Sequence, residues 1–151
     1  MERFIIQTNQ IDLWLKQILE KVPRVIAPVS NGEKTEFRAI NTPEDVANEA
    51  LTTTSSIKAA AFPQTETLFT YQKEGNKTHL SQVSEDEYPQ TVIWHARPCD
   101  AMGFAPLSGI FNWDYKDSLY NARFSKVTIV SFACSTCDEY CFCTSVGGGP
   151  G

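Results

Sequence analysis

Four cysteines lie within ten residues near the C-terminal end of this chain, and this cluster constrains its fold and chemistry more than any other feature. They are Cys134, Cys137, Cys141 and Cys143, and a glycine-rich segment follows them to residue 151. A fifth cysteine, Cys99, stands alone after an Arg-Pro dipeptide. Thiols this close together form disulfides, bind metal or carry out redox chemistry.

Length, charge and the first residues of the chain narrow these possibilities. A chain of 151 residues, 42% hydrophobic and 21% charged, is typical of one globular domain with its own core. A net charge of −5 argues against nucleic-acid or anionic membrane partners, and the apolar runs are too short to span a membrane. No basic region precedes an apolar stretch at the N-terminus, so no secretory signal is visible. We therefore expect a single α/β domain over residues 1–151 in the reducing cytoplasm, where clustered cysteines more often bind metal than form disulfides.

The N-terminal part of the sequence predicts a helix followed by a hairpin. Apolar residues recur at helical spacing over residues 11–22, and Pro23 ends the pattern. Residues 24–29 and 35–40 have the character of strands. Asn31-Gly32 between them is typical of a hairpin turn.

The middle of the chain is less regular. Thr42-Pro43 followed by two acids predicts a helix that extends to about Leu51. Residues 72–90 are polar and charged, which favours a solvated loop or an exposed hairpin.

The second half of the sequence predicts a strand–helix–strand crossover. Residues 91–94 and 126–133 are β-branched and aromatic runs, and residues 100–111 and 115–124 between them can form helices. Such crossovers place parallel strands side by side, and functional groups gather beyond the carboxyl ends of these strands. Cys99 follows the first strand and the other four cysteines follow the second. The predicted fold is therefore α/β, a mixed sheet with flanking helices and a cysteine site at the carboxyl edge of the strands.

The residues themselves leave several chemistries open at this edge. The C-x-x-C spacing of Cys134 and Cys137 chelates one metal ion or one cluster iron, and Cys99 is expected to open a helix whose N-terminal N–H groups favour the thiolate. Backbone N–H groups of the glycine-rich tail suit a negatively charged iron–sulfur cluster, whereas tetrahedral zinc needs only the thiolates. A catalytic thiol pair and a set of buried structural cysteines are the remaining alternatives. His95 could line the same site, but we expect a hydrogen-bonded structural histidine.

Two motifs give the sequence a family resemblance. They are Arg97-Pro98-Cys99-Asp100 and Cys141-Phe142-Cys143-Thr144-Ser145-Val146-Gly147-Gly148-Gly149-Pro150. With these motifs the chain resembles the iron–sulfur β subunits of cytosolic NiFe sulfhydrogenases and the related A subunit of anaerobic sulfite reductases. Weaker matches occur in the expected order at residues 24–29, Phe62-Pro63-Gln64 with Glu66, Leu68-Phe69, and Asp117-x-x-Tyr120-x-x-Arg123.

The resemblance implies a non-catalytic electron-transfer subunit of an oxidoreductase complex. Its partners would be flavin-bearing subunits and hydrogenase or sulfite-reductase subunits. In such proteins a ferredoxin-like region follows this domain, so we expect a chain ending at Gly151 to be an N-terminal fragment. Ser108 stands where the family often has an aspartate, and Phe124 where a second basic residue is common.

The resemblance also implies which residues bind the cofactor. The ligands of one [4Fe–4S] cluster would be Cys99, Cys134, Cys141 and Cys143, with Cys137 an extra thiol that only some members have. The expected cofactor-binding residues around these thiols are Arg97, Asp100, Phe142, Thr144, Ser145, Gly147 and Gly148. The alternatives are a zinc-stabilised interaction module and a thiol–disulfide redox protein that uses Cys134 and Cys137.

Overall fold

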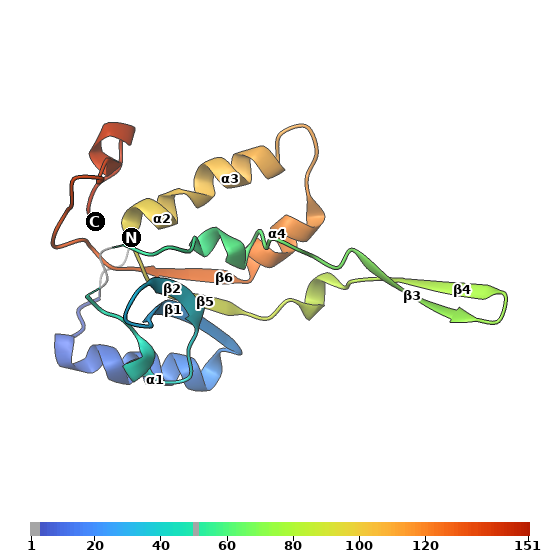
Figure 1. Cartoon of the computed structure of the whole chain (residues 1–151), viewed down its shortest axis with the longest axis horizontal. Coiled ribbons are helices and arrows are strands. Elements are labelled where there is room, and N and C mark those ends of the chain that lie inside the picture. Colours follow the sequence, from blue (N-terminus) through green and yellow to red (C-terminus); the bar gives the residue numbers. More distant parts are fainter. Residues whose placement is uncertain (1–3, 50–51) are drawn as a thin grey trace.

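Two neighbouring parallel strands, β1 (Arg24–Ser30) and β5 (Thr91–Ala96), form the centre of a four-stranded mixed sheet (Figure 1). The computed structural model describes residues 4–49 and 52–151. The strand order is β2-β1-β5-β6, with β2 (Thr35–Ala39) antiparallel to β1 and β6 (Val127–Ser131) parallel to β5. The predicted α/β fold with a mixed sheet is therefore confirmed.

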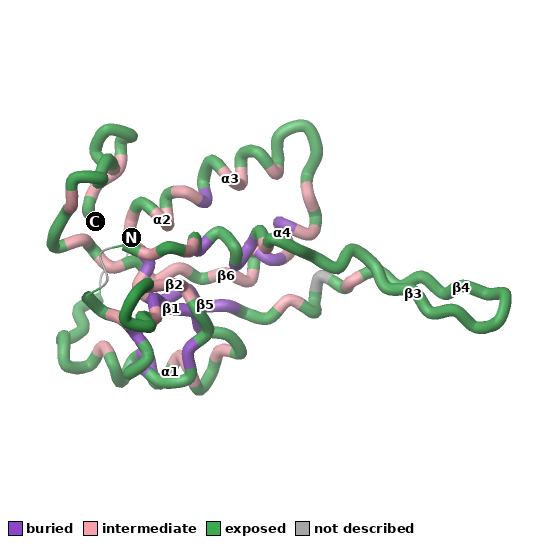
Figure 2. The backbone as a smooth tube through the Cα atoms, viewed as in Figure 1, coloured by how far each residue is buried: buried purple, intermediate pink, exposed green. Residues whose placement is uncertain are grey.

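Alternating side chains bury both faces of the central strands, because successive residues of a strand point to opposite sides of the sheet. Val25 and Trp94 lie in one core cluster with Leu15 of helix α1 (Ile11–Lys21). The adjacent Ile26 and Ile93 lie in a second cluster. That cluster also contains the buried residues Ile57, Ala60, Ala61, Ala96, Phe104 and Tyr120. The sheet is thus covered on one side by α1 and on the other by the crossover helices (Figures 1 and 2).

The predicted crossover connects β5 to β6. It contains α2 (Pro98–Met102), α3 (Phe104–Phe111) and α4 (Ser118–Ser125). The two strands pair in parallel, with Thr91 opposite Val127 and Ile93 opposite Ile129. Both strands therefore end at the same edge of the sheet, where the predicted cysteine segments begin.

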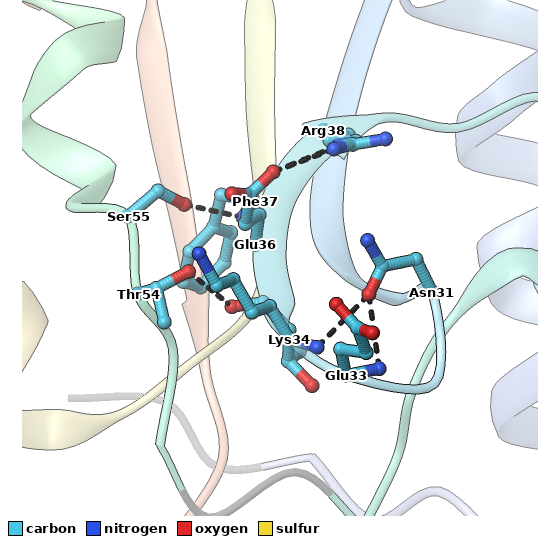
Figure 3. Close-up of polar contacts among 9 residues, drawn as sticks. Asn31, Glu33, Lys34, Glu36, Phe37, Arg38, Thr54 and Ser55 are labelled. Carbon is cyan, nitrogen blue, oxygen red and sulfur yellow. Dashed lines mark hydrogen bonds and ion pairs between the residues drawn. The ribbon is translucent and has the colours of Figure 1, made fainter.

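The predicted hairpin joins β1 to β2, with Ser30 opposite Thr35. Asn31 shapes the loop, because its side-chain oxygen accepts hydrogen bonds from the backbone N–H groups of Glu33 and Lys34 (Figure 3). The outer edge of β2 is partly covered: the N–H of Phe37 donates to Ser55 Oγ at 2.6 Å. These contacts reduce the number of open hydrogen-bonding groups on the edge strand.

The helix predicted from Thr42 to about Leu51 is wrong over the described residues. Only one 3₁₀ turn forms, at Pro43–Asp45, with Thr42 and Asp45 in a capping box. The chain then leaves the helical path because the N–H of Ala47 donates to the carbonyl of Pro28 at 2.8 Å. Leu51 lies outside the described residues. The other 3₁₀ helices are Thr8–Gln10, Ile57–Ala60, Glu85–Glu87 and Cys143–Val146.

Strands β3 (Phe69–Glu74) and β4 (Lys77–Gln82) form a separate antiparallel hairpin that extends from the end of the molecule opposite the C-terminal tail (Figure 1). Of the two alternatives predicted for this polar region, the exposed hairpin is therefore correct. Every residue of the two strands is exposed (Figure 2). None of the helices in the described ranges is both long and apolar enough to cross a membrane.

Candidate functional site

The end of β5 turns sharply before Cys99. The pairing with β6 shifts between Ile93 and Ala96, so that one extra residue is accommodated on β5. His95 lies in this irregular stretch with a φ of 59°, a left-handed conformation that is uncommon for a residue with a side chain. Pro98 then opens α2, and Cys99 occupies the first turn of that helix.

An ion pair joins Arg97 and Asp100, the residues that flank Pro98 and Cys99 in the sequence. Arg97 Nε donates to Asp100 Oδ2 at 2.8 Å, and Arg97 Nη2 donates to Asp100 Oδ1 at 3.3 Å. Both side chains are mostly buried. Because the pair joins the residue before the helix to its first turn, it holds the backbone on either side of Cys99.

The end of β6 is fastened to the end of β5. The N–H of Phe132 and the hydroxyl of Ser131 both donate to the carbonyl of Ala96, at 3.0 and 3.1 Å. The rings of Phe132 and His95 stack with centroids 4.4 Å apart. Cys134 follows two residues later, so these contacts fix the segment that carries it beside the segment that carries Cys99.

The C-terminal tail folds back onto the segment that follows β6. The N–H of Cys134 donates to the carbonyl of Pro150 at 2.6 Å. Within the tail, the 3₁₀ helix Cys143–Val146 ends at Gly147, whose φ of 76° suits a glycine. The N–H of Gly148 then donates to the carbonyl of Cys143 at 2.8 Å. The tail is therefore an ordered loop that begins and ends next to β6.

All five cysteines line one cavity of about 380 Å³ at this edge of the sheet. Cys99 reaches it from α2, and the other four cysteines reach it from the tail. None of the five forms a disulfide. The remaining lining residues are Thr52, Arg97, Pro98, Asp100, Met102, Thr136, Asp138, Tyr140, Phe142, Val146, Gly149 and Pro150.

The predicted cofactor-binding residues divide into two groups. Arg97, Asp100 and Phe142 line the cavity together with the thiols. The residues Thr144, Ser145, Gly147 and Gly148 instead form the turn behind it. The N–H groups of the last three donate to carbonyls of that same turn, at 2.9, 3.4 and 2.8 Å. In this conformation these three N–H groups stabilise the tail and are not available to a cofactor in the cavity.

Met102, Tyr140 and Thr52 line the cavity although sequence analysis did not select them. Met102 lies three residues after Cys99 on the same helix, and this spacing could have indicated it. Its sulfur would lie 2.9 Å from a Cβ at Gly148, so any side chain at that position would force Met102 to shift. Tyr140 adjoins Cys141 in sequence. Nothing in the sequence around Thr52 indicates that it lies near the thiols.

The electrostatic environment links the two cysteine-bearing segments. Burial raises the pKa of the Cys134 thiol, and the nearby Cys99 raises it further, while Arg97 acts in the opposite direction. Burial alone would lower the pKa of Arg97, but Asp100 and the thiols Cys99 and Cys134 raise it overall. The Asp138 N–H lowers the pKa of Cys141, but the Asp138 side chain, burial and Cys137 together raise it. Negative charge on these thiols would therefore be partly balanced by the Arg97 guanidinium.

The prediction that His95 is hydrogen-bonded is wrong for one of its two ring nitrogens. Nδ1 is buried and has no hydrogen-bond partner within the described structure. The ring is held by stacking on Phe132, and burial lowers its pKa. The histidine thus has a structural role at the end of β5, but this role depends on packing.

Comparison with known proteins gives one relative of this chain. Over 129 residues it is 26% identical to sulfhydrogenase 2 subunit beta of Pyrococcus furiosus (strain ATCC 43587 / DSM 3638 / JCM 8422 / Vc1). The chain is a distant relative of that subunit. The match covers 85% of this chain but 36% of the sulfhydrogenase subunit, so the chain spans little more than a third of its relative's length. No family model and no solved structure matches the chain.

Two of the weaker landmarks, Tyr120 and Arg123, are buried. Arg123 is 8% exposed, donates to the carbonyl of Ala61 at 2.8 Å and forms a two-point ion pair with Glu66. The hydroxyls of Tyr120 and Ser108 are 2.7 Å apart. Neither Tyr120 nor Arg123 lines the cysteine cavity, so their contacts indicate a structural role. Phe62, Leu68 and Phe69, which belong to the other landmarks, are more than half exposed.

Proposed function

We propose that this chain is an electron-relay component of an oxidoreductase complex and holds one [4Fe–4S] cluster through Cys99, Cys134, Cys141 and Cys143. The observation that carries the proposal is the convergence of five thiols, from two separate strand ends, on one cavity. Thiolates are the usual protein ligands of iron–sulfur clusters. No residue in the proposal acts on an organic substrate.

A single zinc ion and a group of several irons place different demands on the spacing of the thiols. Four sulfurs around one zinc ion lie about 3.8 Å apart, given a Zn–S distance of about 2.3 Å. Among the described residues, no three His, Cys, Asp or Glu side chains form a group that could hold one metal ion. In the proposal the thiols would instead surround a group of several irons in the cavity that they line.

The surrounding residues have definable roles in this proposal. A bound cluster would supply reversible one-electron transfer. Arg97 would offset the negative charge of the thiolates, and its pairing with Asp100 would hold it in place. Phe142 would cover the cavity with an apolar ring. Protons must leave the thiols during loading, because the ligands are thiolates.

The relationship to sulfhydrogenase 2 subunit beta supports a place in a multi-subunit complex. We propose flavin-bearing subunits and hydrogenase or sulfite-reductase subunits as partners, and the cytoplasm as the location. The chain covers about a third of that relative, so these partners belong to the proposal alone.

Metal analysis of anaerobically purified or reconstituted protein tests the proposed cofactor. We expect brown protein, equal amounts of iron and acid-labile sulfide, and about four irons per chain. Colourless protein with one zinc ion would overturn the proposal in favour of a zinc-stabilised module. Metal-free protein with a reversible Cys134–Cys137 disulfide would favour a thiol–disulfide protein.

Two serine variants test the proposed ligand set. Cys99→Ser should lose most of the bound iron, because it removes the one ligand that comes from α2. Cys137→Ser is the matched control and should keep the wild-type iron content. Equal iron loss in both variants would contradict this assignment of ligands, and wild-type iron in Cys99→Ser would contradict the role of the crossover segment.

A further inference from the structure

Cys137 and Cys141 are the two exposed thiols of the C-terminal tail. No residue from 131 to 151 is buried (Figure 2). Thiols that solvent can reach are the ones most easily oxidised, because the oxidant must approach the sulfur. A peroxide in solution can therefore reach both sulfurs in the iron-free chain.

A tight turn around Asp138 connects these two cysteines. The N–H of Cys141 donates to the carbonyl of Asp138 at 3.3 Å, and the N–H of Tyr140 donates to Asp138 Oδ1 at 2.9 Å. The N–H of Asp138 donates to Cys141 Sγ at 3.4 Å. The side chain of Cys141 is therefore folded back across the turn, toward the peptide bond that joins Asp138 to Cys137.

This last hydrogen bond places the Cys141 sulfur close to Cys137. The Asp138 nitrogen is bonded to the carbonyl carbon of Cys137, so standard bond lengths put Cys141 Sγ at most about 6 Å from Cys137 Cα. Disulfides join cysteines whose Cα atoms are about 4.4–6.8 Å apart. Rotation of the Cys137 side chain, with a small adjustment of the exposed turn, can therefore bring the two sulfurs into bonding contact.

The other thiols have different neighbours. Burial raises the pKa of the Cys134 thiol, and Cys99 and Cys143 are the thiols that raise it further. For Cys141 a backbone N–H lowers the pKa, and Cys137 is among the groups that raise it. This pattern places Cys134 near Cys99 and Cys143, and it places Cys137 near Cys141.

We infer that Cys137 is the resolving thiol of Cys141: when a peroxide oxidises the iron-free chain, the two sulfurs join in a reversible disulfide. A cysteine sulfenic acid that meets a second thiol stops at the disulfide. Without a partner it is oxidised further to a sulfinic acid, which thiol reductants do not reverse. Cys137 thus preserves Cys141, and the benefit for iron binding rests on the proposed function, in which Cys141 is a cluster ligand and Cys137 is not.

The reaction balances in atoms and electrons. The thiolate of one cysteine attacks an oxygen of the peroxide, the O–O bond breaks, and the sulfur becomes a sulfenic acid while hydroxide leaves. The thiolate of the other cysteine attacks the sulfenic sulfur, the S–O bond breaks and the S–S bond forms. The two thiols lose two electrons and two protons, and hydrogen peroxide takes them up and leaves as two water molecules.

Mass spectrometry of the iron-free chain after brief treatment with hydrogen peroxide tests the pairing. Chymotrypsin cleaves after Tyr140 and Phe142, so it puts Cys141 on a different fragment from Cys137. We expect a disulfide that joins these two fragments and that dithiothreitol reverses. A main product with a disulfide between Cys134 and Cys137, or with no disulfide, would overturn the inference.

Two serine variants test the role of Cys137. Cys137→Ser removes the partner, and Cys134→Ser is the matched control because it removes a thiol of the same tail outside the pair. After peroxide and then dithiothreitol, the wild type and Cys134→Ser should each recover about five times more Cys141 thiol than Cys137→Ser. Equal recovery in all three chains would overturn the inference, as would a loss in Cys134→Ser that matches the loss in Cys137→Ser.

Iron loading separates this inference from the proposed function. Chains treated with peroxide and then dithiothreitol are loaded anaerobically with iron and sulfide. The wild type should reach the iron content of untreated protein, and Cys137→Ser should reach less than about half of it, because a sulfinic acid cannot replace a thiolate ligand. Equal iron in both would overturn the protective role. Untreated wild-type protein that binds no iron would instead overturn the proposed function, while the disulfide between Cys137 and Cys141 would still be decided by the mass measurement.

Discussion

His95 combines a left-handed backbone with a buried, unpartnered Nδ1 atom, and both follow from the irregular pairing at the end of β5. The stack of its ring on Phe132 joins the ends of β5 and β6. Strained residues are retained where the surrounding structure compensates for their cost. Here the strained residue is part of the turn that leads from β5 to Cys99.

The stability of the fold should depend on pH through His95. Burial lowers the pKa of His95 from the usual 6.5, so the unfolded chain binds a proton first as the pH falls. The stabilising contribution is complete above about pH 6.5 and is lost as the pH falls through the folded-state pKa. The free energy of unfolding from urea titrations should therefore decrease more steeply between about pH 7 and about pH 5 in the wild type than in His95→Asn.

Asparagine is chosen for this variant because it tolerates the left-handed conformation. The control is His79→Asn, since His79 lies on the exposed β4 strand. This variant should keep the wild-type pH dependence. Identical slopes in the wild type and in His95→Asn would contradict the assignment.

The ion pair between Arg123 and Glu66 should contribute far more to stability than a surface ion pair. Arg123→Met leaves the Ala61 carbonyl without its donor and the Glu66 carboxylate with only the Tyr88 hydroxyl, and we expect a loss of about 3 kcal/mol. The matched control is Arg38→Met, which breaks an exposed pair with Glu36 and should cost less than about 1 kcal/mol. Urea unfolding measures both. A difference below about 1 kcal/mol between them would contradict the assigned role of Arg123.

At the scale of single elements, helix α4 begins at a side-chain cap. Asp117 Oδ1 accepts a hydrogen bond from the N–H of Tyr120 at 2.8 Å. Asp117→Ala should reduce the free energy of unfolding by about 1 kcal/mol, because a helix N–H loses its acceptor. Asp117→Asn keeps an acceptor oxygen and should cost only a few tenths of a kcal/mol. Equal losses in the two variants would show that the charge of Asp117, and not the cap, is what matters.

The elements that were predicted correctly are those with a local signal. The pattern ending at Pro23 predicts α1, and Asn31-Gly32 predicts the β1–β2 hairpin. The crossover was also predictable, because two strands separated by a long helical connection usually lie in parallel in one sheet. That inference placed Cys99 and the tail at one edge of the sheet, where the structure has the cavity.

The elements that could not be predicted depend on contacts between distant residues. The helix expected after Thr42 stops because Ala47 bonds to Pro28 on β1, and no local pattern contains that bond. Arg123 and Glu66 are 57 residues apart in sequence, so their pairing is visible only in three dimensions. The left-handed conformation of His95 also depends on a distant segment, because it occurs where the pairing of β5 with β6 shifts.

At the scale of the whole molecule, the β3–β4 hairpin, residues 69–82, should unfold independently of the four-stranded sheet. Replacing residues 70–81 with Asn-Gly keeps the base of the hairpin and removes only exposed residues. The melting temperature of the sheet should change by less than about 2 °C. Tryptophan fluorescence, to which the buried Trp94 contributes, follows this transition. A decrease of more than about 5 °C would mean that the hairpin supports the sheet.

The hydrogen bond between Cys134 and Pro150 makes the tail an Ω-type loop, whose two ends meet at β6. None of the tail residues belongs to either buried core cluster. The tail can therefore swing open in a local unfolding step that leaves the sheet intact. Its amide hydrogens would exchange with solvent faster than those of β5. Cys137 and Cys141 are already exposed, and opening the tail would also make Cys134 and Cys143 reachable by an iron donor without denaturing the rest of the chain.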